Sequence, residues 1–318
     1  MAALWLAHHE HPKVAAEPQI ALRGSPQVSS RQARTGIGAW TGGAIPHMST
    51  AVARTYRVEA YNPAQASENK IHDDSVARTL GFQGGLVPGV EVYAYACHPV
   101  VEHFGRAWLE RGGIEMRFLK PVYDGRIAAV SAREAAAGLD LEVKSEGALC
   151  AAGRAWLADG AAGARPPPIE AFKLGTSPKI RPVASPTTLA EGTALALPPQ
   201  HLTPEAAAAY LQDVRETDAL YARDGLAHPG AVLRLCNLAL KETVVLPPWI
   251  HVGSRVANFA AARIGDEVSV RARVQANYER KGHRLVDLDA LVIANGDTVV
   301  ARVLHTAIYQ LRQLAACP

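Results

Sequence analysis

Two stretches of this chain match one another at a constant spacing of 141 residues, and this internal similarity constrains the fold more than any other feature. The match needs no gap and includes rare residue types, since the 318 residues contain only five tryptophans and five phenylalanines. Repetition at a fixed spacing is the signature of a duplicated structural unit. The matched pairs are Pro88-Gly89 with Pro229-Gly230, Trp108 with Trp249, Gly112 with Gly253 and Phe118 with Phe259.

Each repeat contains one apolar segment of helical character directly after its Pro-Gly turn. Residues 231–245 carry apolar side chains at helical spacing, which is typical of a buried helix. Residues 90–104 have a similar character, but Pro99 lacks an N–H group, so we expect it to break or kink this helix or to start a second, shorter one.

Strand-like segments flank both helices. Short apolar runs at residues 55–61 and 193–198 precede them, and longer alternating runs follow, separated by turns such as Asp124-Gly125 and Gly265-Asp266. Each of the two repeats is thus expected to contain one apolar helix and a long antiparallel sheet. This combination predicts sheets wrapped around central helices. The predicted fold class is therefore α+β, with two similar domains in tandem.

Composition changes set the expected domain boundaries. Residues 1–47 contain few acids and no sustained periodicity, so we expect a disordered extension there, with Met48 as an alternative start of the protein. The first domain is predicted at 48–158 and the second at 189–318. Prolines and glycines dominate residues 159–188, which is typical of a linker.

Composition and charge argue against several functional classes. The chain is 48% hydrophobic, but it contains no apolar run long enough to cross a bilayer. Its net charge of +3 is small and no Lys/Arg block interleaves with aromatics, so we expect no nucleic-acid partner. The cysteines lie far apart without metal-ligand spacing, which favours free thiols in the cytoplasm and no metal site. They are Cys97, Cys150, Cys236 and Cys317.

A polar loop leads into the first predicted helix and holds the best candidates for chemistry. Asn69 lies three residues before His72, and a glycine-rich segment then runs to Gly89. Histidine suits proton transfer near neutral pH, and the amides at a helix N-terminus can stabilise a developing negative charge. Purely structural roles are the alternative: Asn69 and the acids Asp73 and Asp74 are suited to capping helices, and Gly89 to forming a tight turn.

These residues resemble the MaoC-like (R)-specific enoyl-CoA hydratase and acyl dehydratase family, whose members include double hot-dog proteins. The family motif Asp-x-Asn-Pro-(Leu/Ile)-His corresponds to residues 67–72 (SENKIH), and a later element of that family corresponds to residues 86–89 (LVPG). The resemblance covers most of the chain from about Met48 onward. Ser67 stands where the family has its catalytic Asp, and Lys70 stands where it has Pro.

The resemblance implies hydration of a 2-enoyl thioester, with coenzyme A as part of the substrate and no other cofactor. His72 would transfer the proton, Asn69 would orient the loop or the water, and the N–H of Gly89 would stabilise the thioester oxyanion. A homodimer is expected as well, because paired sheets leave open edges. The candidate catalytic residues are His72, Asn69, Ser67, Glu68 and Gly89, and the candidate substrate-binding residues are Leu86, Val87 and Pro88.

The missing Asp leaves alternatives open. Glu68, Asp73 or Asp74 could supply a carboxylate, or the activity could be lost. A thioesterase using Glu68 or Asp73 and a non-catalytic acyl-CoA-binding protein are therefore the competing hypotheses.

The second repeat lacks the Asn-x-x-His pattern. When Asp218 is aligned with Asp74, Glu216 takes the place of His72. We therefore predict one site per chain, in the first domain, with the second domain building part of the acyl-chain cleft and with His228 in a structural role.

Overall fold

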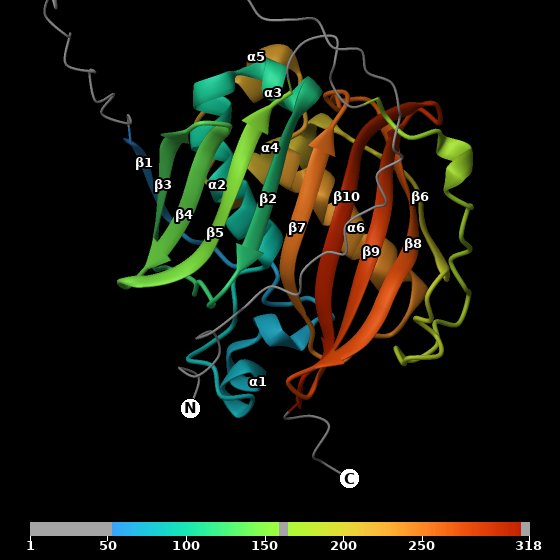
Figure 1. Cartoon of the computed structure of the whole chain (residues 1–318). Helices are drawn as coiled ribbons and strands as arrows, with labels where there is room; N and C mark the ends of the chain where they lie inside the picture. Colours follow the sequence, from blue (N-terminus) through green and yellow to red (C-terminus); the bar gives the residue numbers. More distant parts are fainter. Residues whose placement is uncertain (1–52, 159–164, 313–318) are drawn as a thin grey trace, which may run out of the picture. The chain divides into compact units, whose positions relative to one another are not determined.

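The computed structural model describes residues 53–158 and 165–312, all within one compact unit of the chain (Figure 1). The predictions for residues 1–47, Met48 and Cys317 lie outside the described residues. None of the helices in the described part is long and apolar enough to span a membrane.

The described strands form one antiparallel sheet of ten strands in the order β1-β3-β4-β5-β2-β7-β10-β9-β8-β6 (Figure 1). Each half contributes five neighbouring strands, and the pairing of β2 with β7 joins the halves. The strands are β1 (Ala53–Glu59), β2 (Gly112–Phe118), β3 (Ile127–Ala135), β4 (Gly138–Ser145), β5 (Ala148–Leu157), β6 (Ala194–His201), β7 (Ile250–Asn258), β8 (Glu267–Arg280), β9 (His283–Ala294) and β10 (Thr298–Gln310).

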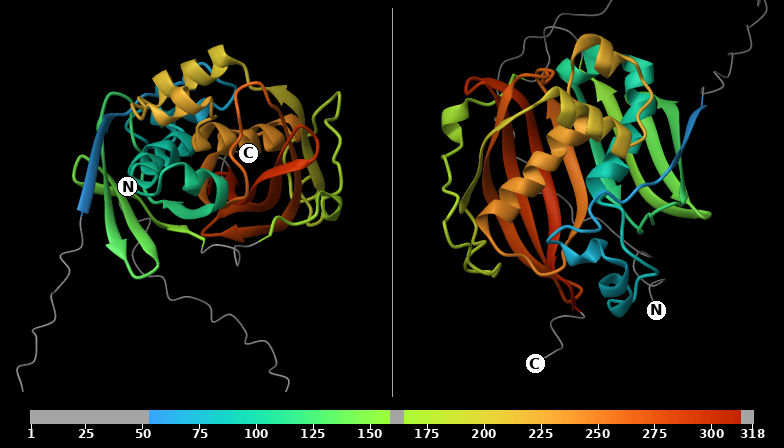
Figure 2. Two further views of the ribbon diagram at one scale, coloured as in Figure 1. Left: turned by 90° about the horizontal axis from the view of Figure 1, so that it is seen from above. Right: turned by 180° about the vertical axis from the view of Figure 1, so that it is seen from behind.

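Two buried helices, α2 and α6, lie side by side against one face of the curved sheet (Figure 2). Their apolar side chains form a continuous core with the inward-facing residues of the strands. Helix α2 continues through Pro99, so the predicted break at this residue was wrong. The helices are α1 (Asp74–Thr79), α2 (Gly89–Phe104), α3 (Arg106–Arg111), α4 (Pro204–Asp213), α5 (Leu220–Asp224) and α6 (Pro229–Thr243), with short 3-10 helices at Lys70–His72 and Ile169–Ala171.

The duplication is real, but its structural register is 140 residues rather than the predicted 141. The bridge between Leu86 and Tyr123 has its counterpart 140 residues later, between Leu226 and Arg263. The N-cap residues of α2 and α6, Pro88 and His228, are also 140 residues apart. Residues matched by identity, such as the two tryptophans, are therefore one position out of structural register.

The predicted linker packs against the sheet. Phe172 is 3% exposed and forms a small apolar cluster with Leu291, Ile293 and Val299 of β9 and β10. Further along, Val183 forms a parallel bridge with Val245 just after α6. The segment from residue 165 onward is therefore part of the packed structure.

Candidate functional site

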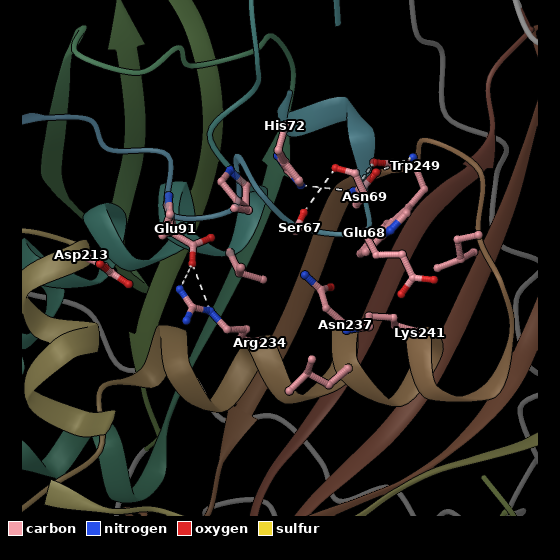
Figure 3. A pocket seen from close by; sticks show the side chains of 16 residues that line it. Ser67, Glu68, Asn69, His72, Glu91, Asp213, Arg234, Asn237, Lys241 and Trp249 are labelled. Atoms are coloured by element: carbon pink, nitrogen blue, oxygen red, sulfur yellow. Dashed lines mark hydrogen bonds and ion pairs between the residues drawn. The ribbon is translucent and has the colours of Figure 1, made fainter. Parts of the chain in front are cut away.

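A cavity of about 270 Å³ lies where the loop before α1 meets helices α2 and α6 (Figure 3). From the first half, Asn69, His72 and the N-cap residue Pro88 line it. From the second half, Arg234 and Lys241 of α6 line it. Both halves of the chain thus contribute to a single cavity.

The side-chain amide of Asn69 joins the loop to the second half of the chain. Its Oδ1 accepts a hydrogen bond from the backbone N–H of Trp249 (3.1 Å), and its Nδ2 donates to the Trp249 carbonyl (3.0 Å). These two bonds fix the orientation of the amide, because the carbonyl can only accept and the N–H can only donate. Nδ2 consequently also donates to Nε2 of His72, 3.1 Å away.

His72 is therefore held as one tautomer of the neutral imidazole. Its Nδ1 lies 2.7 Å from the carbonyl of Leu86, which can only accept, so Nδ1 carries the proton. Nε2 is unprotonated and accepts from Asn69. His72 is only 9% exposed, and burial lowers its pKa even though the bond to Leu86 acts in the opposite direction. The ring thus has a basic nitrogen at neutral pH.

We expect Asn69→Ala to lower the free energy of unfolding by about 2 kcal/mol, because the buried N–H and C=O of Trp249 both lose their partner. Urea denaturation of parent and variant measures the difference. Gln200→Ala removes an exposed amide of β6 and is the control, with an expected change below about 0.5 kcal/mol. An equally small change for Asn69→Ala would contradict its role in joining the two halves.

Ser67 and Glu68 both line the cavity. Neither offers a free carboxylate, because serine has only a hydroxyl group and the carboxylate of Glu68 is already paired. The Ser67 hydroxyl donates to the carbonyl of Asn69 at 3.3 Å. Arg181 binds both carboxylate oxygens of Glu68, at 2.8 and 3.2 Å, and these bonds lower the pKa of Glu68. Glu68 is therefore held as an anion by the predicted linker.

Asp73 and Asp74, the other candidate carboxylates, have structural partners. Oδ1 of Asp73 accepts a hydrogen bond from the N–H of Val76 and so caps α1, as the alternative interpretation predicted. Oδ1 of Asp74 accepts from the N–H of Gly85 at 2.7 Å. Both side chains therefore shape the loop.

The predicted substrate-binding residues divide into two groups. Pro88 lines the cavity, whereas Leu86 and Val87 are core residues, 6% and 4% exposed. Leu86 still contributes to the site through its carbonyl, which fixes the ring of His72. Gly89 is the first residue of α2, and a Cβ there would lie 3.0 Å from Nδ1 of His251. Gly89 is not among the described residues that line the cavity, although its neighbours Pro88 and Val90 are. Its N–H has no acceptor within the helix, and its oxyanion role stays a prediction.

Sequence reasoning missed five polar residues of the cavity, Glu91 on α2, Asp213 on α4, and Arg234, Asn237 and Lys241 on α6. A signal was present, since Glu91 is a lone acid near the start of an apolar helix and Arg234 a lone base near the start of the other. Buried charges of opposite sign on two central helices favour a pair between them. In the structure Arg234 does bind the carboxylate of Glu91.

No protein-family model matches the sequence, and no curated protein matches it either. Solved structures do match. A double hot-dog protein of Mycobacterium tuberculosis has a TM-score of 0.55 at 13% identity, covering 82% of this chain and 96% of its own. A protein from Chloroflexus aurantiacus described as a MaoC domain dehydratase gives 0.54 at 10%, covering 82% and 95%. The N-terminal dehydratase of the difficidin assembly line gives 0.52 at 12%, covering 84% and 96%.

The chain has the double hot-dog fold. At these identities the similarity establishes architecture alone. It confirms the predicted α+β fold of two tandem hot-dog domains, and it confirms the resemblance to MaoC-like proteins at the level of fold.

The second half of the double hot-dog chain has a buried ionic cluster around Glu216. Its Oε1 accepts from Nδ1 of His98 at 2.7 Å, and its Oε2 lies 3.4 Å from Nε2 of His228. Nδ1 of His228 accepts from the N–H of Gly230, so the ring caps α6, which agrees with a structural role. The rings of Tyr210 and Tyr221 pack on His228. Aromatic packing thus surrounds this cluster.

The cysteines of the described residues are buried and free. Burial raises the pKa of Cys97, Cys150 and Cys236, which disfavours the nucleophilic thiolate. Within residues 53–158 and 165–312, no group of three or more His, Cys, Asp or Glu side chains is arranged to hold a metal ion.

Proposed function

We propose that this chain catalyses the reversible addition of water to a 2-enoyl thioester of coenzyme A, with His72 taking a proton from the water. One observation carries the proposal: a neutral imidazole, fixed as a single tautomer, lines a cavity beside the start of α2. Structural neighbours described as dehydratases support the same class of reaction. Coenzyme A enters as part of the substrate, and the reaction transfers no electrons to a cofactor.

The chemistry requires a base, an acid and donors for a developing oxyanion. As water attacks the β-carbon, negative charge accumulates on the thioester oxygen, which fixed N–H groups stabilise. We assign this role to the N–H of Gly89, because the positive end of the α2 dipole lies there. Nε2 of His72 receives the proton of water once that water replaces the Asn69 hydrogen bond at this nitrogen.

Thioester hydrolysis is the second candidate on this fold. It would need a carboxylate to activate water against the carbonyl carbon, and the candidates for this role are Glu68 and Asp73. Both are already engaged, Glu68 by Arg181 and Asp73 by the first turn of α1. Neither of these two carboxylates is therefore free to activate water. A non-catalytic acyl-CoA-binding protein is the third candidate, because Ser67 replaces the Asp of the family.

Crotonyl-CoA distinguishes the three candidates in one assay. The purified chain is expected to consume the enoyl absorbance and form 3-hydroxybutyryl-CoA, while a thiol reagent detects no free coenzyme A. Release of free coenzyme A would instead indicate a thioesterase. If neither reaction occurs and acyl-CoA only raises the melting temperature, the chain is a binding protein. Either of these last two results would overturn the proposal.

A further inference from the structure

Glu91 is a buried acid of α2 whose two oxygens have different surroundings. The residue is 1% exposed and lines the cavity (Figure 3). Arg234 of α6 donates from both Nε and Nη2 to Oε1, with an Nε distance of 3.1 Å. Oε2 has no hydrogen-bond partner among the described residues. One oxygen is therefore anchored, and the other is buried without a partner.

The unpaired oxygen needs a hydrogen-bond partner from outside the described residues. Leaving a buried polar atom without a partner costs about 1–3 kcal/mol, and more when the group is charged. Oδ1 of Asn237, which also lines the cavity, likewise has no partner within the described part of the chain. Two unsatisfied polar atoms at one cavity are suited to a ligand that brings its own polar groups, such as a water molecule and a thioester.

We propose that Glu91 is the acid of this active site, replacing the carboxylate that Ser67 cannot supply. The proposal rests on the proposed hydratase function and deepens it. Glu91 and His72 line the same cavity from different elements, the central helix and the preceding loop. The other acids near the loop are engaged elsewhere, whereas Arg234 holds Glu91 by one oxygen and leaves the second free.

The two residues divide the proton transfers of hydration. The oxygen of water bonds to the β-carbon while Nε2 of His72 takes one of its protons. The π electrons of the double bond move to the α-carbon, which takes the proton of Oε2 of Glu91. The products are the 3-hydroxyacyl thioester, an imidazolium and a carboxylate. A proton returning from His72 to Glu91 through water restores both groups, and dehydration follows the reverse order.

The surroundings of both groups agree with these roles. Burial raises the pKa of Glu91, against the influence of Arg234, while burial lowers the pKa of His72. Shifts in these opposite directions agree with an acid and a base that line one cavity. The other groups that face Glu91 or share its cavity are Arg234 and Lys241 of α6, Asp213 and Tyr210 of α4, Tyr95 of α2, and Glu68 of the loop.

Glu91→Gln tests the assignment. We expect kcat/KM for crotonyl-CoA hydration to fall by about 100-fold or more, because the amide cannot deliver a proton to the α-carbon. Glu102→Gln is the matched control on the same helix, since Glu102 is exposed and pairs with Arg54, and it should keep the parent value. Glu91→Asp retains the acid and should keep part of the activity. Melting temperatures establish that each variant is folded.

The pH dependence separates a chemical role from a structural one. In the parent, kcat/KM should fall at low pH as His72 becomes protonated and at high pH as Glu91 ionises. Glu91→Gln should lose the alkaline limb, and Glu91→Asp should keep it. Retention of the alkaline limb, or of kcat/KM within about threefold of the parent, by Glu91→Gln would overturn the role of Glu91 and leave hydration by His72 standing. A parent protein inactive on crotonyl-CoA would instead overturn the proposed function itself.

Discussion

Replacing His72 by alanine is expected to lower kcat/KM for crotonyl-CoA hydration by about three orders of magnitude, the magnitude typical of losing a positioned general base. Among the described residues near the loop, only the imidazole ring of His72 has a fixed tautomer with an unprotonated nitrogen. Neither Ser67 nor Glu68 can replace it, because the serine is a poor base and Arg181 holds the glutamate. Initial rates with crotonyl-CoA measure the effect.

Two further variants make this result specific to the chemistry. His72→Gln keeps a polar side chain at the buried position but has no basic nitrogen, so it should be nearly as slow as the alanine variant. His201→Ala removes an exposed histidine at the end of β6 and should leave the rate unchanged. If His72→Gln is folded and its kcat/KM lies within about threefold of the parent, His72 is not the base.

Much of the order of elements was predictable because hydrophobic periodicity indicates helices and strands directly. Both central helices and most of the strands around them appear as local patterns, and these patterns are present in the structure. Strand β7, which joins the two halves, and helix α4 were not among the predicted elements. The register of the repeat was not predictable in this way. Trp108 lies in α3 and Trp249 immediately before β7, so their constant spacing is a coincidence of identity, whereas backbone hydrogen bonds set the true offset.

The same distinction applies to the site. Asn69 and His72 are three residues apart, and a short loop brings them together whatever the rest of the chain does. The pair of Glu91 and Arg234 spans 143 residues and exists only because α2 packs beside α6. Local patterns do not encode such a contact, although a charge within an otherwise apolar helix marks the positions where one is needed.

Glu216→Ala is expected to lower the free energy of unfolding by about 3 kcal/mol at neutral pH, because it removes one partner of a buried ionic cluster. The carboxylate also accepts the N–H groups of Thr217 and Asp218, both at 2.7 Å. Burial alone would raise the pKa of Glu216, but interactions with His228 and His98 lower it well below its usual range. Urea denaturation measures the loss, with Glu110→Ala as control, because Glu110 is a half-buried residue of α3 that pairs only with Arg106 of its own helix among the described residues.

The loss of unfolding free energy caused by Glu216→Ala should depend on pH, because the ionised form of each group in the cluster contributes only over part of the pH range. The depressed pKa of Glu216 stabilises the fold above its unfolded-state pKa, and this contribution disappears as pH falls through the folded-state value. Burial lowers the pKa of His98, but the hydrogen bond to Glu216 and the nearby negative charges together raise it overall. The contribution of His98 therefore disappears as pH rises through its folded-state pKa. The difference between Glu216→Ala and the parent should therefore be greatest between the unfolded-state pKa of Glu216 and that of His98, and it should shrink at lower and at higher pH. Glu216 does not line the cavity and none of the proposed catalytic groups belongs to its cluster, so the folded variant should keep kcat/KM within about threefold of the parent. A folded variant without hydratase activity would show that the Glu216 cluster takes part in the chemistry.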